Sequence, residues 1–256
     1  MAHSVETLIR DLRLRRGRER RGLALAEGVR LVEEAVEAGV SFRLAAVAPA
    51  LEGTARGRAL KARLETARVE LHSIDDRALA GLADTEHPQG IVAVIEPPAW
   101  ALDQVRLDAR AVVLVLDGVQ DPGNVGTMIR TALGLGAAGV VALKGTAELT
   151  SPKVLRATMG AIFRLPCVPS DDEAFLPWAA GHRLGLWLAE AGGTPVRQWR
   201  PARPLALVMG NEGAGVREAL ATAAAGRVGI PLQPGSESLN VAVAAGILLS
   251  EVRDVP

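Results

Sequence analysis

Short apolar runs alternate with longer amphipathic segments along this chain, and the alternation predicts an α/β protein. Three runs in the second half, at 112–116, 205–209 and 228–232, are apolar on both faces and rich in β-branched residues. Such runs are typical of strands buried in a parallel sheet. A loop of glycines and polar residues follows each run, and ligands of open α/β sheets lie beyond the carboxyl ends of the strands. We therefore expect the three loops to converge on a small-molecule site.

The same alternation runs through the first half and organises the chain into domains. It predicts helices at 29–39, 57–67, 76–83, 173–181 and 239–252 and from 151, and further strands at 42–48, 69–74, 90–96, 139–143 and 184–190 and near 161–168. Pro97 and Pro98 cannot continue a central strand, so the segment around them is expected to be a linker. The predicted organisation is a domain at 1–95, a linker at 96–110 and a domain at 111–256.

Composition is that of an ordinary globular protein, with 49% hydrophobic residues among 256. Apolar stretches stay below the ~20 residues that a membrane helix needs, and charges stand where a signal peptide would be apolar. We therefore expect a cytoplasmic protein without membrane contact. The one cysteine, Cys167, and four scattered histidines show no ligand spacing, so we expect no metal site. Cys167 is expected to be buried, with a nucleophilic role as the alternative.

Formal net charge is zero, but residues 10–21 hold seven arginines against two acidic residues, a local charge of +5. Such a cluster can bind RNA phosphates, or it can be the solvated face of a helix. Apolar residues at helical spacing just upstream predict that part of the segment packs as an amphipathic helix. They are Val5, Leu8, Ile9 and Leu12. The candidate RNA-binding residues are Arg13, Arg15, Arg16, Arg18, Arg20 and Arg21.

The loop after the first of the three runs has the chemistry of a helix start. Asp121 can cap free backbone amides, and Pro122 lacks the donor that would go unpaired in a first turn. Asn124 and Arg130 follow on this predicted helix and are candidates for a polar site; alternatively, Asn124 only closes a turn and Arg130 is a surface residue.

Three glycines in the same region, Gly134, Gly136 and Gly139, match the dinucleotide-binding pattern GxGxxG. That fingerprint needs a strand before it and a helix after it, whereas here the order is reversed. We interpret these glycines as a helix end and a tight turn.

Polar residues also fill the second and third loops. Asn211 and Glu212 directly follow the run at 205–209, and the third loop precedes a helix of small residues that would let another backbone pack closely. The polar residues of the third loop are Ser236, Glu237, Ser238 and Asn240.

Together the three loops resemble the three motifs of the SpoU (TrmH-like) branch of the SPOUT RNA methyltransferases. DPGNVGTMIRTA (121–132), MGNEGAG (209–215) and IPLQPGSESLNVAVA (230–244) occur in the family's order. The segments 23–39 and 84–98 are more loosely similar to the small L30e-like substrate-binding domain that precedes the methyltransferase domain in ribosomal-RNA members.

The resemblance implies a mostly parallel α/β-knot fold, with a deep trefoil knot that binds S-adenosylmethionine. It also implies homodimers with sites at the subunit interface, and transfer of a methyl group to a ribose 2′-hydroxyl of RNA. The L30e-like domain favours 23S ribosomal RNA as substrate. The alternatives are a transfer-RNA methyltransferase and a non-catalytic RNA-binding or ribosome-assembly protein of the same fold.

By the same resemblance, Arg130 matches the family's catalytic arginine. A guanidinium is effectively always protonated, so we expect Arg130 to stabilise the forming alkoxide, with Glu212 as the alternative proton acceptor. The supporting polar residues are Asn124, Ser238 and Asn240. The residues matching cofactor-binding positions are Met209, Gly210, Ile230 and Leu239.

Overall fold

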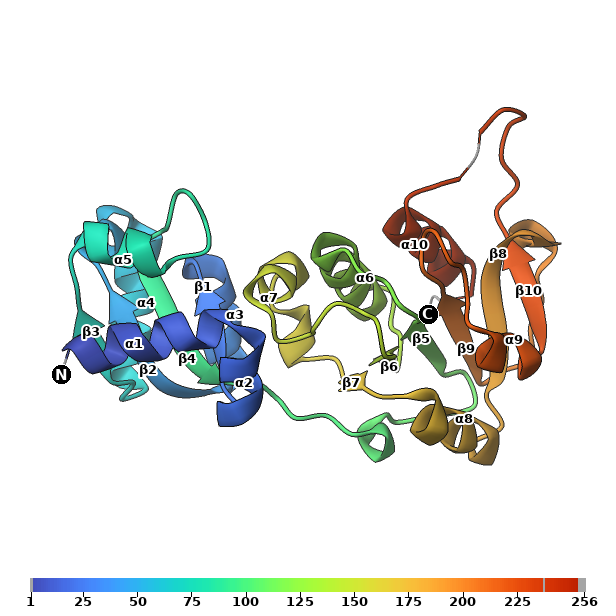
Figure 1. Ribbon diagram of the computed structural model, residues 1–256, viewed down its shortest axis with the longest axis horizontal. Coiled ribbons are helices and arrows are strands. Elements are labelled where there is room, and N and C mark those ends of the chain that lie inside the picture. Colours follow the sequence, from blue (N-terminus) through green and yellow to red (C-terminus); the bar gives the residue numbers. More distant parts are fainter. Residues whose placement is uncertain (1, 237, 253–256) are drawn as a thin grey trace. The chain divides into compact units, whose positions relative to one another are not determined.

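The computed structural model describes residues 2–236 and 238–252, and over these the chain forms two compact units (Figure 1). The first unit comprises Met1–Pro98 with Thr150–Phe163, and the second comprises Ala99–Leu149 with Arg164–Pro256. The first unit thus includes a segment, Thr150–Phe163, that lies well beyond the predicted linker in sequence. The domain bounds 1–95 and 111–256 stay a prediction.

Within the described residues, the first unit forms a four-stranded sheet in the order β1-β4-β2-β3. β4 runs antiparallel to β1 and β2, and β3 runs parallel to β2. The strands are β1 (Ala24–Glu27), β2 (Ser41–Val47), β3 (Leu71–Ser73) and β4 (Ile91–Glu96). The helices are α1 (Ala2–Arg13), α2 (Arg15–Arg21), α3 (Val29–Glu37), α4 (Ala55–Thr66), α5 (Asp76–Leu82) and α7 (Pro152–Thr158), with 3₁₀ turns η1 (Pro49–Gly53) and η3 (Ala161–Phe163).

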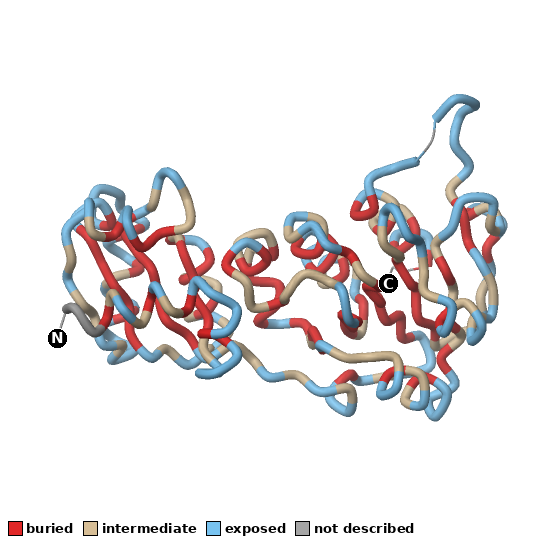
Figure 2. Tube along the Cα trace, viewed as in Figure 1, coloured by how far each residue is buried: buried red, intermediate tan, exposed pale blue. Residues whose placement is uncertain are grey.

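The helix and strand predictions for this unit are confirmed to within a few residues, except that β1 was not predicted and that 161–163, predicted as part of a strand, form η3. β1 is only four residues long, half of them alanine, which has a low strand propensity. The predicted amphipathic helix is α1, whose Val5, Ile9 and Leu12 are buried against the sheet. Figure 2 shows the buried residues following the strands and one face of each long helix.

Helix α7 is held in the first unit by an ion-pair network. Arg156 on α7 bonds the Asp84 carboxylate at 2.6 Å (Nη2 to Oδ2) and reaches Glu27 of β1 at 3.3 Å (Nη1 to Oε2). Glu27 is 5% exposed, and its carboxylate also accepts the backbone N–H groups of Asp84 and Thr85. The hydrogen bond from Arg156 is the main reason that the pKa of Asp84 lies below its usual value of 3.8.

The second unit, over the residues that the structure describes, forms a six-stranded sheet in the order β10-β8-β9-β5-β6-β7, with neighbouring strands parallel. The strands are β5 (Val112–Leu116), β6 (Gly139–Ala142), β7 (Cys167–Pro169), β8 (Gly185–Pro195), β9 (Leu205–Met209) and β10 (Gly226–Gly229). The helices are α6 (Pro122–Gly134), α8 (Asp172–Gly181), α9 (Glu218–Thr222) and α10 (Val241–Val252), with 3₁₀ turns η2 (Leu102–Gln104) and η4 (Val196–Gln198).

The predicted parallel sheet is therefore confirmed, and β5 and β9 have the predicted bounds. The strand predicted at 228–232 is wrong at its far end, because β10 stops at Gly229 before Pro231, which has no N–H to donate. The strand predicted near 161–168 is also largely wrong: 161–163 form η3, and β7 begins only at Cys167. The trefoil knot stays a prediction.

Two smaller expectations are confirmed in this unit. Helix α6 ends at Gly134 and Gly136 has a φ of 74°, so the GxGxxG match is a helix end and a turn. Cys167 is buried, and burial raises the pKa of its thiol well above the usual range.

None of the described helices is long and apolar enough to cross a membrane. Within the same residues, no group of three or more histidine, cysteine, aspartate or glutamate side chains could hold a metal ion.

We predict that Arg156→Gln lowers the free energy of unfolding of the first unit by roughly 1–3 kcal/mol at pH 7, because two carboxylates lose a charged hydrogen-bond donor. Since the folded state lowers the pKa of Asp84, the stabilisation is present above about pH 4 and is lost as the pH falls through the lowered value. The difference in free energy of unfolding between the variant and the wild type should therefore shrink as the pH falls below about 4.

Circular dichroism in urea follows the unfolding of both units, and tryptophan fluorescence identifies the part that belongs to the second unit, which holds all four tryptophans. The remaining part of the circular dichroism change measures the first unit. Arg77→Gln, at an exposed arginine of the first unit, is the control. A deficit that is the same at pH 3 as at pH 7 would contradict the role of the ion pair.

Candidate active site

The register of the central strands brings the first two loops together. Leu116 of β5 pairs with Met209 of β9, so both strands end at the same level. The N–H of Asp117 then donates to the carbonyl of Met209 at 2.8 Å, and the Asn211 side-chain amide donates to the carbonyl of Gly118 at 2.8 Å. The two loops are thus hydrogen-bonded to each other from their first residues.

A cavity of about 490 Å³ lies beside these loops, along the middle of β8 and at the ends of β9 and β10. It is lined by the four residues predicted to bind a cofactor, Met209, Gly210, Ile230 and Leu239. Glu212 and Ser238 also line it. Further apolar side chains complete the wall: Leu188, Val216, Val228, Leu232, Val241 and Leu248.

Glycines make this cavity possible by letting backbone segments approach closely. A Cβ at Gly210 would lie 2.7 Å from the carbonyl carbon of Gly215, and one at Gly229 would lie 2.7 Å from the carbonyl oxygen of Glu190. Both distances are too short for a side chain, so these positions need glycine.

Asn124 connects all three loops through its side-chain amide. Its Nδ2 donates to Glu212 Oε1 at 2.9 Å, and its Oδ1 accepts from Asn240 Nδ2 at 2.9 Å. Asn124 stands at the start of α6, whose first turn is capped by the Asp121 carboxylate through the N–H of Asn124 at 2.7 Å. Residues from the first, second and third loops therefore meet at one amide.

The direction of this hydrogen-bond chain is set by helix α10. Asn240 Oδ1 accepts the N–H groups of Ala242 and Val243 at the start of the helix, at 2.9 and 3.3 Å. Its Nδ2 must then face Asn124, which presents its own Oδ1 and keeps Nδ2 for the Glu212 carboxylate. An amide whose orientation is fixed in this way leaves Glu212 Oε2 available to another group.

Of the five predicted catalytic residues, the structure joins Asn124, Glu212 and Asn240 by hydrogen bonds, and places Ser238 in the cavity lining. Arg130 is not joined to them. It is exposed on α6, and within the described residues it has no hydrogen bond or ion pair. Glu237 of the third motif lies outside the described residues.

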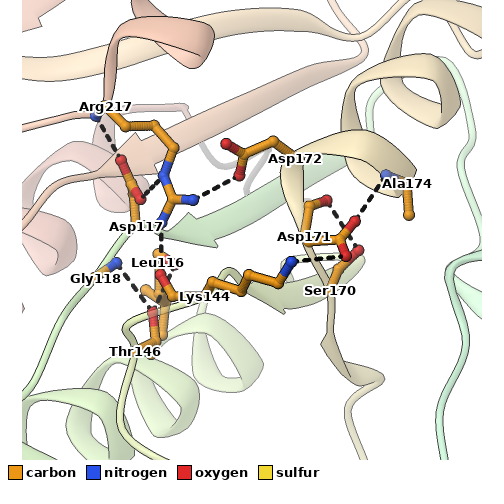
Figure 3. A network of polar contacts seen from close by, with 10 residues as sticks. All are labelled: Leu116, Asp117, Gly118, Lys144, Thr146, Ser170, Asp171, Asp172, Ala174 and Arg217. Carbon is orange, nitrogen blue, oxygen red and sulfur yellow. Dashed lines mark hydrogen bonds and ion pairs between the residues drawn. The ribbon is translucent and has the colours of Figure 1, made fainter.

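A second polar network, which sequence reasoning missed, joins the start of the first loop to the segment that follows the second loop (Figure 3). Asp117 is 3% exposed, and its carboxylate accepts both the Nε (2.6 Å) and the backbone N–H (2.8 Å) of Arg217. Arg217 also bonds Asp172 of α8 at 2.7 Å (Nη1 to Oδ1). Thr146 Oγ1 donates to the Leu116 carbonyl at 2.9 Å.

The charges of this network stabilise one another. Burial works against the charge of Arg217, but the hydrogen bonds to Asp117 and Asp172 outweigh it and raise the pKa of the guanidinium. The N–H of Ala174, followed by Lys144, lowers the pKa of the half-buried Asp171. The signal in the sequence was a carboxylate directly after a buried strand, LD at 116–117, whose partner lies one hundred residues away.

The SpoU rRNA Methylase family model matches residues 111–250, more than half of the chain. The chain belongs to this family. An MRM3-like substrate binding domain model matches residues 7–93.

Relatives of this SpoU methylase match nearly its whole length. The 23S rRNA (guanosine(2553)-2'-O)-methyltransferase RlmP of Bacillus subtilis is 34% identical, over 95% of this chain and 94% of its own. The 23S rRNA (uridine(2479)-2'-O)-methyltransferase of Streptomyces viridochromogenes is 33% identical, over 93% and 84%.

Solved structures match as closely. AviRb of Streptomyces viridochromogenes, in complex with the cofactor AdoMet, has a TM-score of 0.85 at 31% identity, covering 96% of both chains. The AdoMet-bound rRNA methyltransferase of Sinorhizobium meliloti has a TM-score of 0.86 at 28% identity, covering 98% of this chain and 95% of its own.

The arginine run of this SpoU methylase lies apart from the three loops in sequence, on α1 and α2 of the first unit. Arg18 is 5% exposed, and its Nη1 donates to the carbonyls of Leu12 and Arg13 at 2.8 Å, so it holds the two helices together. Among the others, Arg20 and Arg21 bond the Asp11 carboxylate, Arg15 bonds Glu19, Arg13 lies 3.9 Å from Asp84, and Arg16 is exposed.

We predict that Asp117→Asn destabilises the second unit by roughly 1–3 kcal/mol, because a partly buried guanidinium loses its charged partner. Tryptophan fluorescence during urea unfolding reports on this unit, which contains all four tryptophans. Asp103→Asn, at an exposed aspartate of the same unit, should leave the transition unchanged. Equal stability of the two variants would show that the network does not hold the loops.

Proposed function

We propose that this protein is an S-adenosylmethionine-dependent methyltransferase that modifies a ribose 2′-hydroxyl in 23S ribosomal RNA. The observation that carries the proposal is the meeting of the three loops at Asn124, at the edge of a cavity lined by the four cofactor candidates. The names of the relatives and the AdoMet-bound neighbours support it. Because those relatives act on ribosomal RNA, we place the protein in the cytoplasm.

The cavity fits this cofactor in size and chemistry. At about 490 Å³ it lies within the range of small-molecule pockets, which are mostly apolar with a few placed polar groups. Ile230, Leu239 and Leu248 supply apolar surface for an adenine ring, and Glu212 offers a carboxylate to a cationic ligand. S-adenosylmethionine supplies a methyl group on a positively charged sulfur, which needs little activation.

The protein must then bind the ribose and accept its proton. Glu212 Oε1 is occupied by the Asn124 amide, and Oε2 is left to take the proton of the 2′-hydroxyl. Arg130 stabilises the negative charge that develops on the same oxygen, since its guanidinium keeps its proton. Holding the methyl group of the cofactor in line with the ribose oxygen supplies much of the remaining rate acceleration.

We further propose that a second copy of the chain covers the outer face of α6 and α10. Arg130 lies on an exposed stripe of α6 with Gly123, Thr127 and Gly134. On α10, Val243 is 53% exposed, and Leu239 just before the helix is 37% exposed. In such a homodimer Arg130 would complete a site together with residues of the neighbouring copy.

The experiment that tests the function directly is incorporation of tritium from labelled S-adenosylmethionine into RNA of a strain that lacks the gene. Label in 23S ribosomal RNA, at one ribose on mapping, is the expected result. Label in transfer RNA alone would favour the transfer-RNA alternative, and the absence of label in any RNA would favour a non-catalytic binding protein.

For the cofactor site, we predict that Leu239→Arg weakens S-adenosylmethionine binding at least about 100-fold, because it places an unpaired charge in the apolar part of the lining. Isothermal titration calorimetry measures the affinity. Leu14→Arg, at a 65% exposed leucine of the first unit, is the matched control. Wild-type affinity in the Leu239 variant would exclude this cavity as the cofactor site.

For catalysis, Arg130→Ala should reduce methyl transfer by about 100-fold or more, since it removes a charge that acts in the transition state. Cofactor affinity should stay near the wild-type value because Arg130 does not line the cavity. Arg106→Ala, at an exposed arginine of the same unit, is the control. Unchanged turnover in the Arg130 variant would refute its assignment.

For the dimer, Val243→Asp should convert a dimer into a monomer, because it places a charge in an apolar contact. Sedimentation equilibrium gives the mass, with Ala223→Asp, at an exposed position of the second unit, as the control. A wild-type protein that sediments as a monomer at all concentrations would contradict the proposed second copy.

A further inference from the structure

The first unit contains a cavity of about 640 Å³ that none of the three motifs reaches. Its walls come from the β1–α3 junction, the η1–α4 turn, the loop before β4, and α7. Its lining includes Arg30, Arg56, Arg156, Val29, Thr54 and Met159. All of them belong to the same compact unit.

Hydrogen bonds fix the walls of this cavity, which is called the groove below. Gln89 Oε1 accepts the N–H of Val29 at the start of α3 at 2.9 Å. A Cβ at Gly28, which has a φ of 94°, would lie only 3.2 Å from that same oxygen. Glu27 binds the loop before β4 through the N–H groups of Asp84 and Thr85 at 2.8 and 3.1 Å. The groove is therefore built before any ligand arrives.

The described lining includes three guanidinium groups, and two of them are already neutralised. Arg56 bonds Glu33 at 2.7 Å (Nε to Oε2), and Arg156 bonds Asp84 and Glu27. Arg30 differs from both, because it is exposed and has no hydrogen bond or ion pair to any described residue. Of the three arginines in the described lining, Arg30 is therefore the one whose charge is available to an anionic ligand.

The rest of the lining selects the kind of anion. Val29, Pro88 and Met159 give the groove an apolar wall, and Thr54 and His87 add hydrogen-bonding groups. A free inorganic anion would have no use for the apolar wall. A nucleotide has an apolar base face, polar base edges and a phosphate, and unpaired RNA bases are commonly held by arginine planes and apolar surfaces.

Building on the function proposed above, we propose that this groove holds an unpaired nucleotide of the RNA substrate, with Arg30 on its phosphate. The arginine run of α1 and α2 is a poorer candidate for that contact. Arg18 is buried there, Arg15 bonds Glu19 of the same helix, and Arg20 and Arg21 of α2 bond Asp11 of α1. Arg30 is thus a substrate-binding residue outside the methyltransferase motifs.

The test compares Arg30→Ala, Arg30→Lys and Arg77→Ala with the intact wild-type chain. Arg77 is an exposed arginine of the same unit with no partner among the described residues, so it matches Arg30 in charge. The probe is a 23S ribosomal RNA fragment that the wild type methylates. RNA affinity is measured from 50 to 200 mM salt, and S-adenosylmethionine affinity is measured by calorimetry.

Arg30→Ala should weaken RNA binding roughly tenfold and reduce the slope of log affinity against log salt by about 1. Arg30→Lys should restore most of the slope, because a phosphate accepts either cation. Arg77→Ala should match the wild type, and cofactor affinity should be the same in all four proteins.

Arg30→Ala and Arg77→Ala with equal RNA affinity and salt slope would overturn the proposed groove while leaving the methyltransferase assignment intact. A wild type that binds S-adenosylmethionine but methylates no RNA would instead refute the proposed function, and the groove with it. A loss of RNA binding in Arg30→Ala with an unchanged salt slope would also overturn the phosphate contact.

Discussion

The site depends on a single side-chain amide that can be satisfied in only one direction. The N–H groups at the start of α10 fix Asn240, Asn240 fixes Asn124, and Asn124 then donates to Glu212. Each member is held by a group from another loop, so moving one loop leaves a polar group of the next without its partner. These hydrogen bonds therefore select one arrangement of the three loops, which apolar packing alone would not do.

Two further features allow that meeting. Parallel pairing with level ends, Leu116 opposite Met209, delivers the first two loops to one edge of the sheet. The buried Asp117 then fixes the segment that follows the second loop through two hydrogen bonds from Arg217. A similar arrangement occurs in the first unit, where Glu27 bonds both the loop before β4 and Arg156 of α7 and so holds them around the groove.

Much of this could be predicted from sequence, because it rests on local chemistry. Runs such as VVLVL and LALVM are typical of buried strands and form β5 and β9, and Asp121-Pro122 begins α6 as expected. Long-range pairs could not be predicted. No residue near Asp117 in sequence indicates that its partner is Arg217. Similarly, no residue near Arg18 indicates that its guanidinium bonds the Leu12 carbonyl at the end of α1. Predictions of short elements were also wrong where alanine or proline weakens the strand pattern, as in β1 and at the end of β10.

A crystal structure of the protein with S-adenosylmethionine tests the central claim most directly. We predict that the cofactor lies in the cavity beside Met209 and Leu239, with both hydrogen bonds of the Asn124 amide intact. A cofactor bound elsewhere, or an Asn124 side chain turned away from Glu212, would contradict it.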